Sequence, residues 1–281
     1  MLRRLPIWLA SAACAAALFA CAGPATSTDT RPANDIARPA VDLGGLGLEV
    51  RGWVVDNRDQ RLARRLASFE AGDALSAEAD AAWQACGVRV VQVPTEQLSP
   101  LAVSLVSGPE SRVWLGQTPQ WTEAYATAES ESRRGVRMPE GDLVLAPGAI
   151  RLLVRAWFER SVVDAQERRN LRVDLVPQNR ERTFNSLTLE PIDPTRPLDV
   201  GLVIDRLASV WRSDGSTALL LVPADPGEDW GAIAAQVGPP EYEPGVFGPP
   251  MRTAPTLGQA LLGTPRDGFD IVLVLIPRTQ Q

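Results

Sequence analysis

The fold is decided by the stretch Phe269-Asp270-Ile271-Val272-Leu273-Val274-Leu275-Ile276 near the C-terminus. After Ile271 every residue is apolar, so the alternation of polar and apolar side chains that marks a half-exposed strand is absent. A strand of this kind is covered on both faces. We therefore predict a central strand with a β-sheet core on one side and another sheet or a helix on the other.

Alternating segments upstream predict further strands around this one. Residues 149–160 have an apolar face and a polar face with Arg151 and Arg155, and residues 171–176 repeat the alternation beyond a polar hairpin at 164–169. Residues 199–212 and 217–222 predict a hairpin across the turn 213–216, although the first arm also fits a helix. Residues 109–281 are therefore expected to form a β-rich, mainly antiparallel domain.

Residues 48–108 predict a small α+β unit, so that the chain as a whole is assigned to the α+β class. Residues 48–55 and 88–93 alternate like strands, with Pro94 ending the second. Ser76 is the expected N-cap of a first helix, and Gly87 lies past its end. Thr95 is the expected cap of a second helix, whose apolar face would hold Leu98, Leu101, Val103 and Leu105.

The N-terminus resembles the signal peptide of bacterial lipoproteins. Arg3 and Arg4 precede an uncharged apolar run that is too short to remain as a membrane span, and the run ends in Leu18-Phe19-Ala20-Cys21. In that family the signal, here residues 1–20, is removed and the Cys, here Cys21, receives acyl chains. A plain signal peptide cut at a neighbouring small residue is the alternative.

The resemblance implies a protein held in membrane lipid through acylated Cys21, because several acyl chains together give stable attachment. Ala22 stands where the family has Asp to retain a protein in the inner membrane, which favours the outer membrane, on its periplasmic or surface side. Residues 21–47 are rich in Gly, Pro, Ser and Thr and predict a flexible tether between the anchor and the folded part.

Composition excludes several classes of function. The 281 residues are 45% hydrophobic and 22% charged, a globular ratio, and they contain no His, which removes His-dependent triads and His metal ligands. Loss of residues 1–20 takes the net charge from −6 to −8, so the chain is not expected to bind nucleic acid. Cys86, the one Cys left besides Cys21, is expected to be buried and unreactive.

Two segments are candidates for chemistry. Residues 223–255 form a long Pro- and Gly-rich loop whose acids could bind calcium or act as a carboxylate pair: Asp225, Glu228, Asp229, Glu241 and Glu243. A solvated loop with no such role is the favoured alternative, interrupted only by a short helix over residues 229–236 that Asp229 is expected to cap. Trp114 and Trp121 flank a polar turn and could form a sugar-binding site, although both indoles could equally fill the core.

The C-terminal end resembles the secretin homology domain. There, a Leu-Gly-Asp-Ile-Pro-type hairpin precedes a hydrophobic strand ending in Thr-Pro, and this chain has Leu257-Gly258-Gln259-Ala260 before residues 271–278, with Gln259 and Ala260 in place of Asp and Ile. The unit at 48–108 is also similar in kind to the small periplasmic domains that precede a secretin barrel. The resemblance implies a structural role in the cell envelope.

These observations favour a non-catalytic, lipid-anchored envelope lipoprotein that docks on another envelope protein, in an assembly of the secretion type. No catalytic or nucleotide-binding motif occurs in the sequence, and no cofactor or metal is expected. Two alternatives stay open, a carbohydrate-binding module using Trp114 and Trp121 and a hydrolase using carboxylates of the 223–255 loop.

Overall fold

The computed structural model describes residues 45–69, 74–163, 166–182, 196–236 and 254–279, all of which belong to one compact unit. Strands predominate and their pairing is mainly antiparallel, as expected. The strands are β1 (Gly47–Asp56), β2 (Val88–Pro94), β3 (Val106–Gly116), β4 (Thr118–Ala126), β5 (Arg134–Met138), β6 (Gly141–Leu145), β7 (Gly148–Val163), β8 (Gln166–Glu181), β9 (Leu202–Val203), β10 (Ser209–Ser213), β11 (Thr217–Pro223) and β12 (Phe269–Arg278). The helices are α1 (Arg61–Leu66), α2 (Ala77–Ala85), α3 (Leu98–Leu105), α4 (Trp230–Ala235) and α5 (Leu257–Leu262), joined by short 3-10 turns.

Sheet A has the strand order β2-β11-β12-β1-β3 and is antiparallel throughout. β12 is its middle strand, and it pairs with β1 from Gly47↔Arg278 to Asp56↔Phe269. Leu273 and Leu275 point to one core, while Val272, Val274 and Ile276 point to the other. The prediction of a central strand covered on both faces is confirmed.

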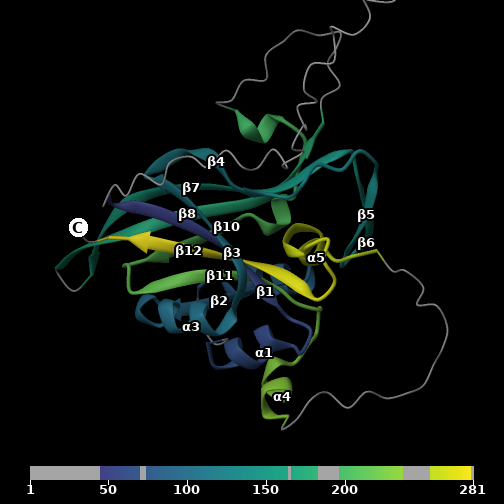
Figure 1. The fold of residues 1–281 in the computed structure, drawn as a ribbon. Coiled ribbons are helices and arrows are strands. Elements are labelled where there is room, and N and C mark those ends of the chain that lie inside the picture. The colour runs from purple at the N-terminus through teal and green to yellow at the C-terminus, as the bar shows by residue number, and fades with distance from the viewer. Residues whose placement is uncertain (1–44, 70–73, 164–165, 183–195, 237–253, 280–281) are drawn as a thin grey trace, which may run out of the picture. The chain divides into compact units, whose positions relative to one another are not determined.

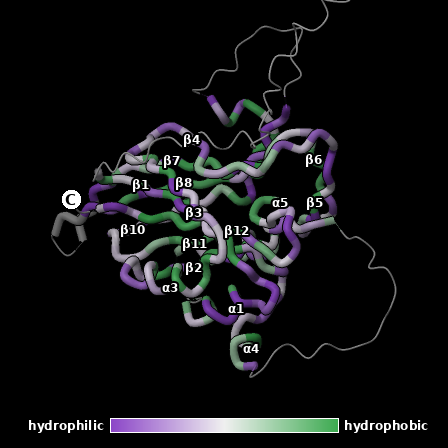
Figure 2. Tube along the Cα trace, viewed as in Figure 1, coloured by the Kyte–Doolittle hydropathy of each residue, from purple (hydrophilic) through white to green (hydrophobic). Residues whose placement is uncertain are grey.

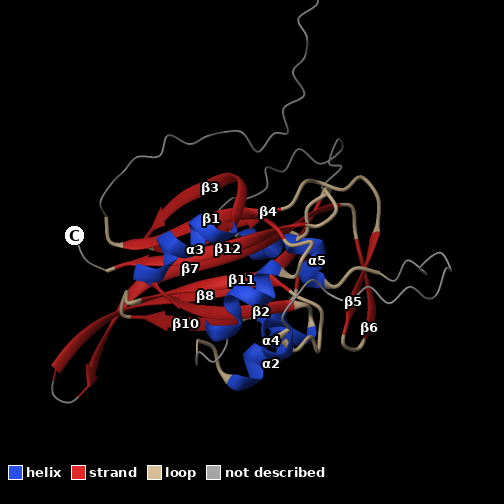
Figure 3. Ribbon diagram, turned by 60° about the horizontal axis from the view of Figure 1, so that its bottom comes forward, coloured by secondary structure: helices blue, strands red, loops and turns tan. Residues whose placement is uncertain are grey.

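Sheet B has the order β10-β8-β7-β4, with β9 beside β8. β7 and β8 form a long hairpin that pairs from Gly148↔Glu181 to Val163↔Gln166. The hairpin extends past the neighbouring strands at one end (Figure 3). A separate hairpin of β5 and β6 lies at the other side.

The two sheets stack on one another, and helices cover the outside of sheet A, giving three layers (Figure 1). The core between the sheets contains Val50 and Leu273 from sheet A and Leu152 and Val173 from sheet B. Burial of each Leu contributes about 1.5–3 kcal/mol. The strongly hydrophobic colouring of the strands inside the molecule follows this packing (Figure 2).

The second core lies between sheet A and helices α1, α3 and α4. Trp53 of β1, Leu66 of α1, Leu105 of α3 and Trp230 of α4 are fully buried there or nearly so. Strand alternation explains the division, because side chains at even positions of β1, such as Val50, face sheet B, and Trp53 and Val55 face the helices.

Local capping follows the sequence at two sites. Ser76 accepts a hydrogen bond from the Ala79 amide at 3.3 Å, and Gly87 takes the positive φ of 83° that follows the end of α2. Asp229 caps α4 by accepting from the Ala232 amide at 3.0 Å. Both caps were expected, and both satisfy backbone groups that a helix end leaves open.

Two expectations about α3 are wrong. Thr95 does not cap the helix, because it lies in a 3-10 turn and its hydroxyl contacts the Ser216 carbonyl at 3.2 Å. Val103 does not share the apolar face of Leu98, Leu101 and Leu105, since its side chain is 89% exposed.

The expected hairpin across residues 213–216 is also absent. β10 pairs with β8 in sheet B, whereas β11 pairs with β2 and β12 in sheet A. The turn therefore carries the chain from one layer to the other. Gly215 has a φ of 100°, which a glycine adopts without strain.

Strands from both ends of the folded part share sheet A. β1 and β2 come from residues 48–108, and β11 and β12 come from the C-terminal part of the chain. Residue 108, the expected boundary, lies within β3. Among the described residues, no helix is long and apolar enough to cross a membrane.

Candidate functional site

The outward face of sheet B carries alternating Trp, Arg and carboxylate side chains, and we call it the Trp–Arg face. It consists of Trp121, Arg155, Trp157, Glu159, Arg172, Asp174 and Arg212. Arg155, Trp157 and Glu159 lie two residues apart on β7, so they project from the same side of the strand. Asp174 is paired directly with Arg155, and Arg172 with both Trp157 and Arg212.

The aromatic rings and guanidinium groups of this face stack in a row. The Arg155 guanidinium lies 5.0 Å from the centre of the Trp121 ring and 5.2 Å from that of Trp157. The Arg172 guanidinium lies 4.9 Å from the Trp157 ring. Cation–π contacts at these separations are favourable by about 0.5–1 kcal/mol each at partly exposed sites.

Two carboxylates accept hydrogen bonds from the arginines of this face. Asp174, which is buried, accepts hydrogen bonds of 2.7 Å from the Nε atoms of both Arg155 and Arg172. Glu159 accepts from Arg172 at 2.9 Å and from Arg212 at 3.1 Å. Desolvation alone would raise the pKa of Glu159, but the hydrogen bonds from Arg172 and Arg212 outweigh it and lower the pKa.

On the same outward face of sheet B, Arg151 makes a group of buried polar contacts. Its side chain donates to Gln178 at 2.7 Å, to Glu123 at 3.2 Å and to the Pro197 carbonyl at 2.9 Å. Arg151 was expected on a polar, solvent-facing side of its strand, and the polar contacts agree. The side chain is not exposed to solvent, however, because residues near Pro197 cover it. This burial lowers the pKa of the Arg151 guanidinium.

A second charged group lies at one end of the helix-covered face of sheet A. Glu49 of β1 is 1% exposed and contacts Arg51 of β1, Arg112 of β3 and Arg278 of β12. Desolvation would raise the pKa of Glu49, but the hydrogen bonds and charges of Arg278 and Arg51 outweigh it, so the pKa lies below the usual 4.5.

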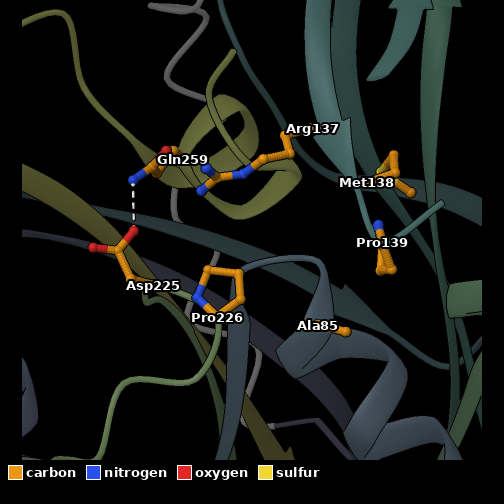
Figure 4. A pocket seen from close by; sticks show the side chains of 7 residues that line it. All are labelled: Ala85, Arg137, Met138, Pro139, Asp225, Pro226 and Gln259. Atoms are coloured by element: carbon orange, nitrogen blue, oxygen red, sulfur yellow. Dashed lines mark hydrogen bonds between the residues drawn. The ribbon is translucent and has the colours of Figure 1, made fainter. Parts of the chain in front are cut away.

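A shallow pocket of about 570 Å³ lies where the end of α2, the β5–β6 hairpin, α5 and the segment after β11 meet. Its lining includes Ala85, Arg137, Met138, Asp225 and Gln259, and the Gln259 amide donates to Asp225 at 3.1 Å (Figure 4). The pocket thus holds one cation and one carboxylate, without a neighbouring acid–base pair.

The structure does not bring Trp114 and Trp121 together. Trp114 is paired with Glu49 and lies on the helix-covered side of sheet A, whereas Trp121 lies on the outward face of sheet B. Both are half-buried, and neither belongs to the apolar cores. They do not form one flat platform for a sugar ring.

The described acids of the 223–255 loop have structural partners. Asp225 accepts from Gln259, Glu228 accepts from the Trp230 indole at 3.1 Å, and Asp229 caps α4. Glu241 and Glu243 lie outside the described residues. Within the described ranges, no group of three or more Cys, Asp and Glu side chains could hold a metal ion.

Cys86 is fully buried and free at the end of α2, and burial raises the pKa of its thiol. The expected burial is confirmed, and low reactivity of the thiol stays a prediction. Cys21 and the whole of residues 1–20 lie outside the described residues, so the anchor stays a sequence prediction. Leu257 to Leu262, compared above with a secretin hairpin, form helix α5, which begins with a capping box between Thr256 and Gln259.

Sequence reasoning missed the Trp–Arg face, although part of its signal was present. Arg155-Ala156-Trp157-Phe158-Glu159 and Arg172-Val173-Asp174 place the charged and aromatic residues at alternate positions of two strands. Pairing of β7 with β8 then places the two sets side by side. Comparison with known proteins finds no matching family model, no matching curated protein and no matching solved structure.

Proposed function

We propose that this protein is a non-catalytic, lipid-anchored component of the cell envelope that docks on another envelope protein through the Trp–Arg face. Anchoring rests on the Leu18 to Cys21 motif. The docking proposal is based on the residue types of the Trp–Arg face and on the fixed positions of their side chains. An assembly of the secretion type, on the outer membrane, is the setting that the sequence resemblance favours.

The single observation that carries the docking proposal is the Trp121–Arg155–Trp157–Arg172 row. Trp and Arg are the residue types that most often dominate the energy of protein interfaces. Arg155 and Arg172 are already held by Asp174 and Glu159, and both Trp rings are stacked on these arginines, so a partner would not have to order them. A preordered surface of this kind favours recognition of a protein over catalysis.

The stacked cations argue against the carbohydrate alternative. A sugar ring binds an indole by lying flat on its face, and two guanidinium groups already lie over the Trp157 ring. The hydrolase alternative would need two carboxylates facing one cleft, and the pocket in Figure 4 offers Asp225 without a second acid. We therefore do not propose either activity.

The α+β label for residues 48–108 belongs to the same proposal. It describes the order strand, helix, strand, helix along that part of the chain, and sheet A joins those strands to β11 and β12. We propose that these residues fold together with the C-terminal strands.

The anchor is tested by Cys21→Ser in the full chain. We expect the variant to leave the membrane fraction and the wild type to carry added lipid mass. A variant that still sediments with membranes, together with an unlipidated wild type, would show that the anchor is assigned wrongly.

Docking is tested by cross-linking the wild type in native membranes and comparing it with Trp157→Ala. We expect the wild type to form a discrete cross-linked product with one envelope protein, and Trp157→Ala to lose it while keeping a cooperative melt. Arg65→Ala, on the exposed side of α1, is the matched control that should keep the product. An equal product from Trp157→Ala would overturn the docking surface, and no product from the wild type would overturn docking itself.

A further inference from the structure

The Glu49 cluster on sheet A has more positive charge than its carboxylates neutralise. Three arginines, Arg51, Arg112 and Arg278, surround Glu49, and Arg51 also reaches Glu110 at 3.2 Å. The cluster therefore carries three positive and two negative charges. This excess stands out in a chain whose formal net charge is −6.

The hydrogen bonds to Glu49 use only part of each guanidinium. Glu49 Oε1 is 2.7 Å from Nε of Arg51 and 2.6 Å from Nε of Arg112, while Oε2 accepts from both Nε and Nη2 of Arg278, at 2.9 and 2.6 Å. Each guanidinium has further N–H donors on its terminal nitrogens. The side chains of Arg112 and Arg278 are 46% and 42% exposed, so both guanidinium-bearing side chains reach solvent, from which a second anion can approach.

Strand register places the arginines close together. Arg51 of β1 is directly opposite Arg112 of β3, and Gly47 opposite Arg278 brings the third guanidinium to the same end of the sheet. Like charges at directly opposite positions of a sheet are destabilising unless an anion lies between them. Glu49 supplies one such anion from its buried position, and the solvent side of the cluster is left for another.

We propose that Arg112 and Arg278, held in place by Glu49, form a binding site for a phosphate-type oxyanion. Arginine suits this ligand because its planar group donates two parallel hydrogen bonds to phosphate oxygens. Two chemical sources share this group, a soluble phosphate and the phosphate of an anionic lipid. The lipid source fits this position, since Gly47, which begins β1 at this end of the sheet, is also the last residue of the predicted tether from Cys21.

The test uses the full mature chain with Cys21→Ser, which removes the anchor as a cause of membrane binding. Inorganic phosphate is titrated at constant ionic strength, and heat release and the shift in melting temperature are measured. Sedimentation with vesicles of phosphatidylcholine alone and of phosphatidylcholine with phosphatidylglycerol forms the second arm. Saturable binding to inorganic phosphate assigns the soluble source, and binding to phosphatidylglycerol vesicles alone assigns the lipid source.

Arg112→Gln is the decisive variant, because Arg112 lies on the edge strand β3 and its loss leaves Glu49 paired with two other arginines. We expect its affinity for the ligand identified to fall at least about tenfold. Arg278→Gln is a second variant with the same expected loss, and Arg65→Gln should bind like the parent. If the parent binds neither phosphate nor phosphatidylglycerol, or if both cluster variants bind as well as it does, the site does not exist.

Discussion

The outward faces of sheets A and B both arise from strand alternation, but they differ in their side chains and in what covers them. On sheet A the outward side chains are Trp53, Val55, Val272 and Val274, and helices α1, α3 and α4 bury them. On sheet B the outward side chains include Arg155, Trp157, Arg172 and Asp174, and no described helix covers this row. The apolar face is covered by helices of the same chain, whereas no described helix covers the ordered polar face.

The two outward faces should differ in how much their side chains contribute to stability. The outward face of sheet A supports the fold mainly through apolar packing, with charged side chains at its Glu49 end and at Arg89, whose guanidinium lies over the Trp230 ring. The Trp–Arg face has its charges paired and its rings stacked, yet the large side chains stay half-exposed. Substitutions should therefore destabilise the molecule strongly on the first face and weakly on the second.

The largest effect is expected for Leu273→Asp in the middle of β12. Leu273 is buried between the sheets, and an unpaired carboxylate there would add a desolvation cost to the lost apolar contact. We expect a loss of more than about 4 kcal/mol, sufficient to prevent folding. Val144→Asp places the same residue on a strand at a side chain that is 61% exposed, and it should cost less than about 1 kcal/mol in urea denaturation. Equal stability of the two variants would contradict the assignment of β12.

Glu49→Gln should have the next largest effect and should depend on pH. The pKa of Glu49 is lowered in the folded state, so its stabilisation is present above the usual value of 4.5 and is lost as the pH falls through the folded-state pKa. At pH 7 we expect a cost of about 2–3 kcal/mol, since three arginines lose their charged partner. Urea denaturation at pH 7 and pH 3 should show the difference between wild type and variant shrinking at the lower pH. A constant difference would argue against the ionised pair.

A smaller effect is expected for Arg151→Ala on sheet B. The substitution leaves Gln178 and the Pro197 carbonyl without a donor in a covered position, so we expect a loss of about 1–2 kcal/mol. Arg212→Ala, at the exposed end of the Trp–Arg face, should change stability by less than about 0.5 kcal/mol. Thermal melts of the two variants measure this difference. Equal losses of stability would contradict the assignment of Arg151 to a covered part and Arg212 to an exposed part of sheet B.

The smallest effect is expected for Val103→Ser on α3. Its side chain faces solvent, so stability should change by less than about 0.5 kcal/mol. Leu101→Ala, on the same helix but packed on sheet A, should cost about 2–4 kcal/mol. A large effect of the Val103 change would mean that this side of α3 is covered.

Local pattern was sufficient for strands β1, β2, β7, β8, β11 and β12 and for two helix caps. The apolar run of β12 predicted its double coverage, and Ser76 and Asp229 predicted where α2 and α4 begin. These features depend on neighbouring residues alone. Long-range pairing was not predictable in the same way, because residues 209–223 carry no local signal that β10 and β11 enter different sheets.

The candidate site was less accessible to sequence reasoning than the fold. The alternation in β7 and β8 could have predicted that Arg155, Trp157 and Asp174 share a face. Trp121 joins them only because the register of β4 shifts between Thr118 and Thr122, which no periodicity predicts. Arg151 likewise has an ordinary polar position in its strand, and its burial depends on the distant Pro197 segment.

The pairing of β1 with β12 also determines the order in which this protein can fold. The chain is synthesised N-terminus first, so β1 is made long before the strand that lies beside it in sheet A. Until β12 arrives, β1 and β11 each lack their shared neighbour, and apolar strand edges stay open to wrong partners. Joining the two ends requires a long loop closure, which makes folding slow relative to proteins with local contacts. A chain truncated before β12 should consequently aggregate, even though it retains every residue of the Trp–Arg face.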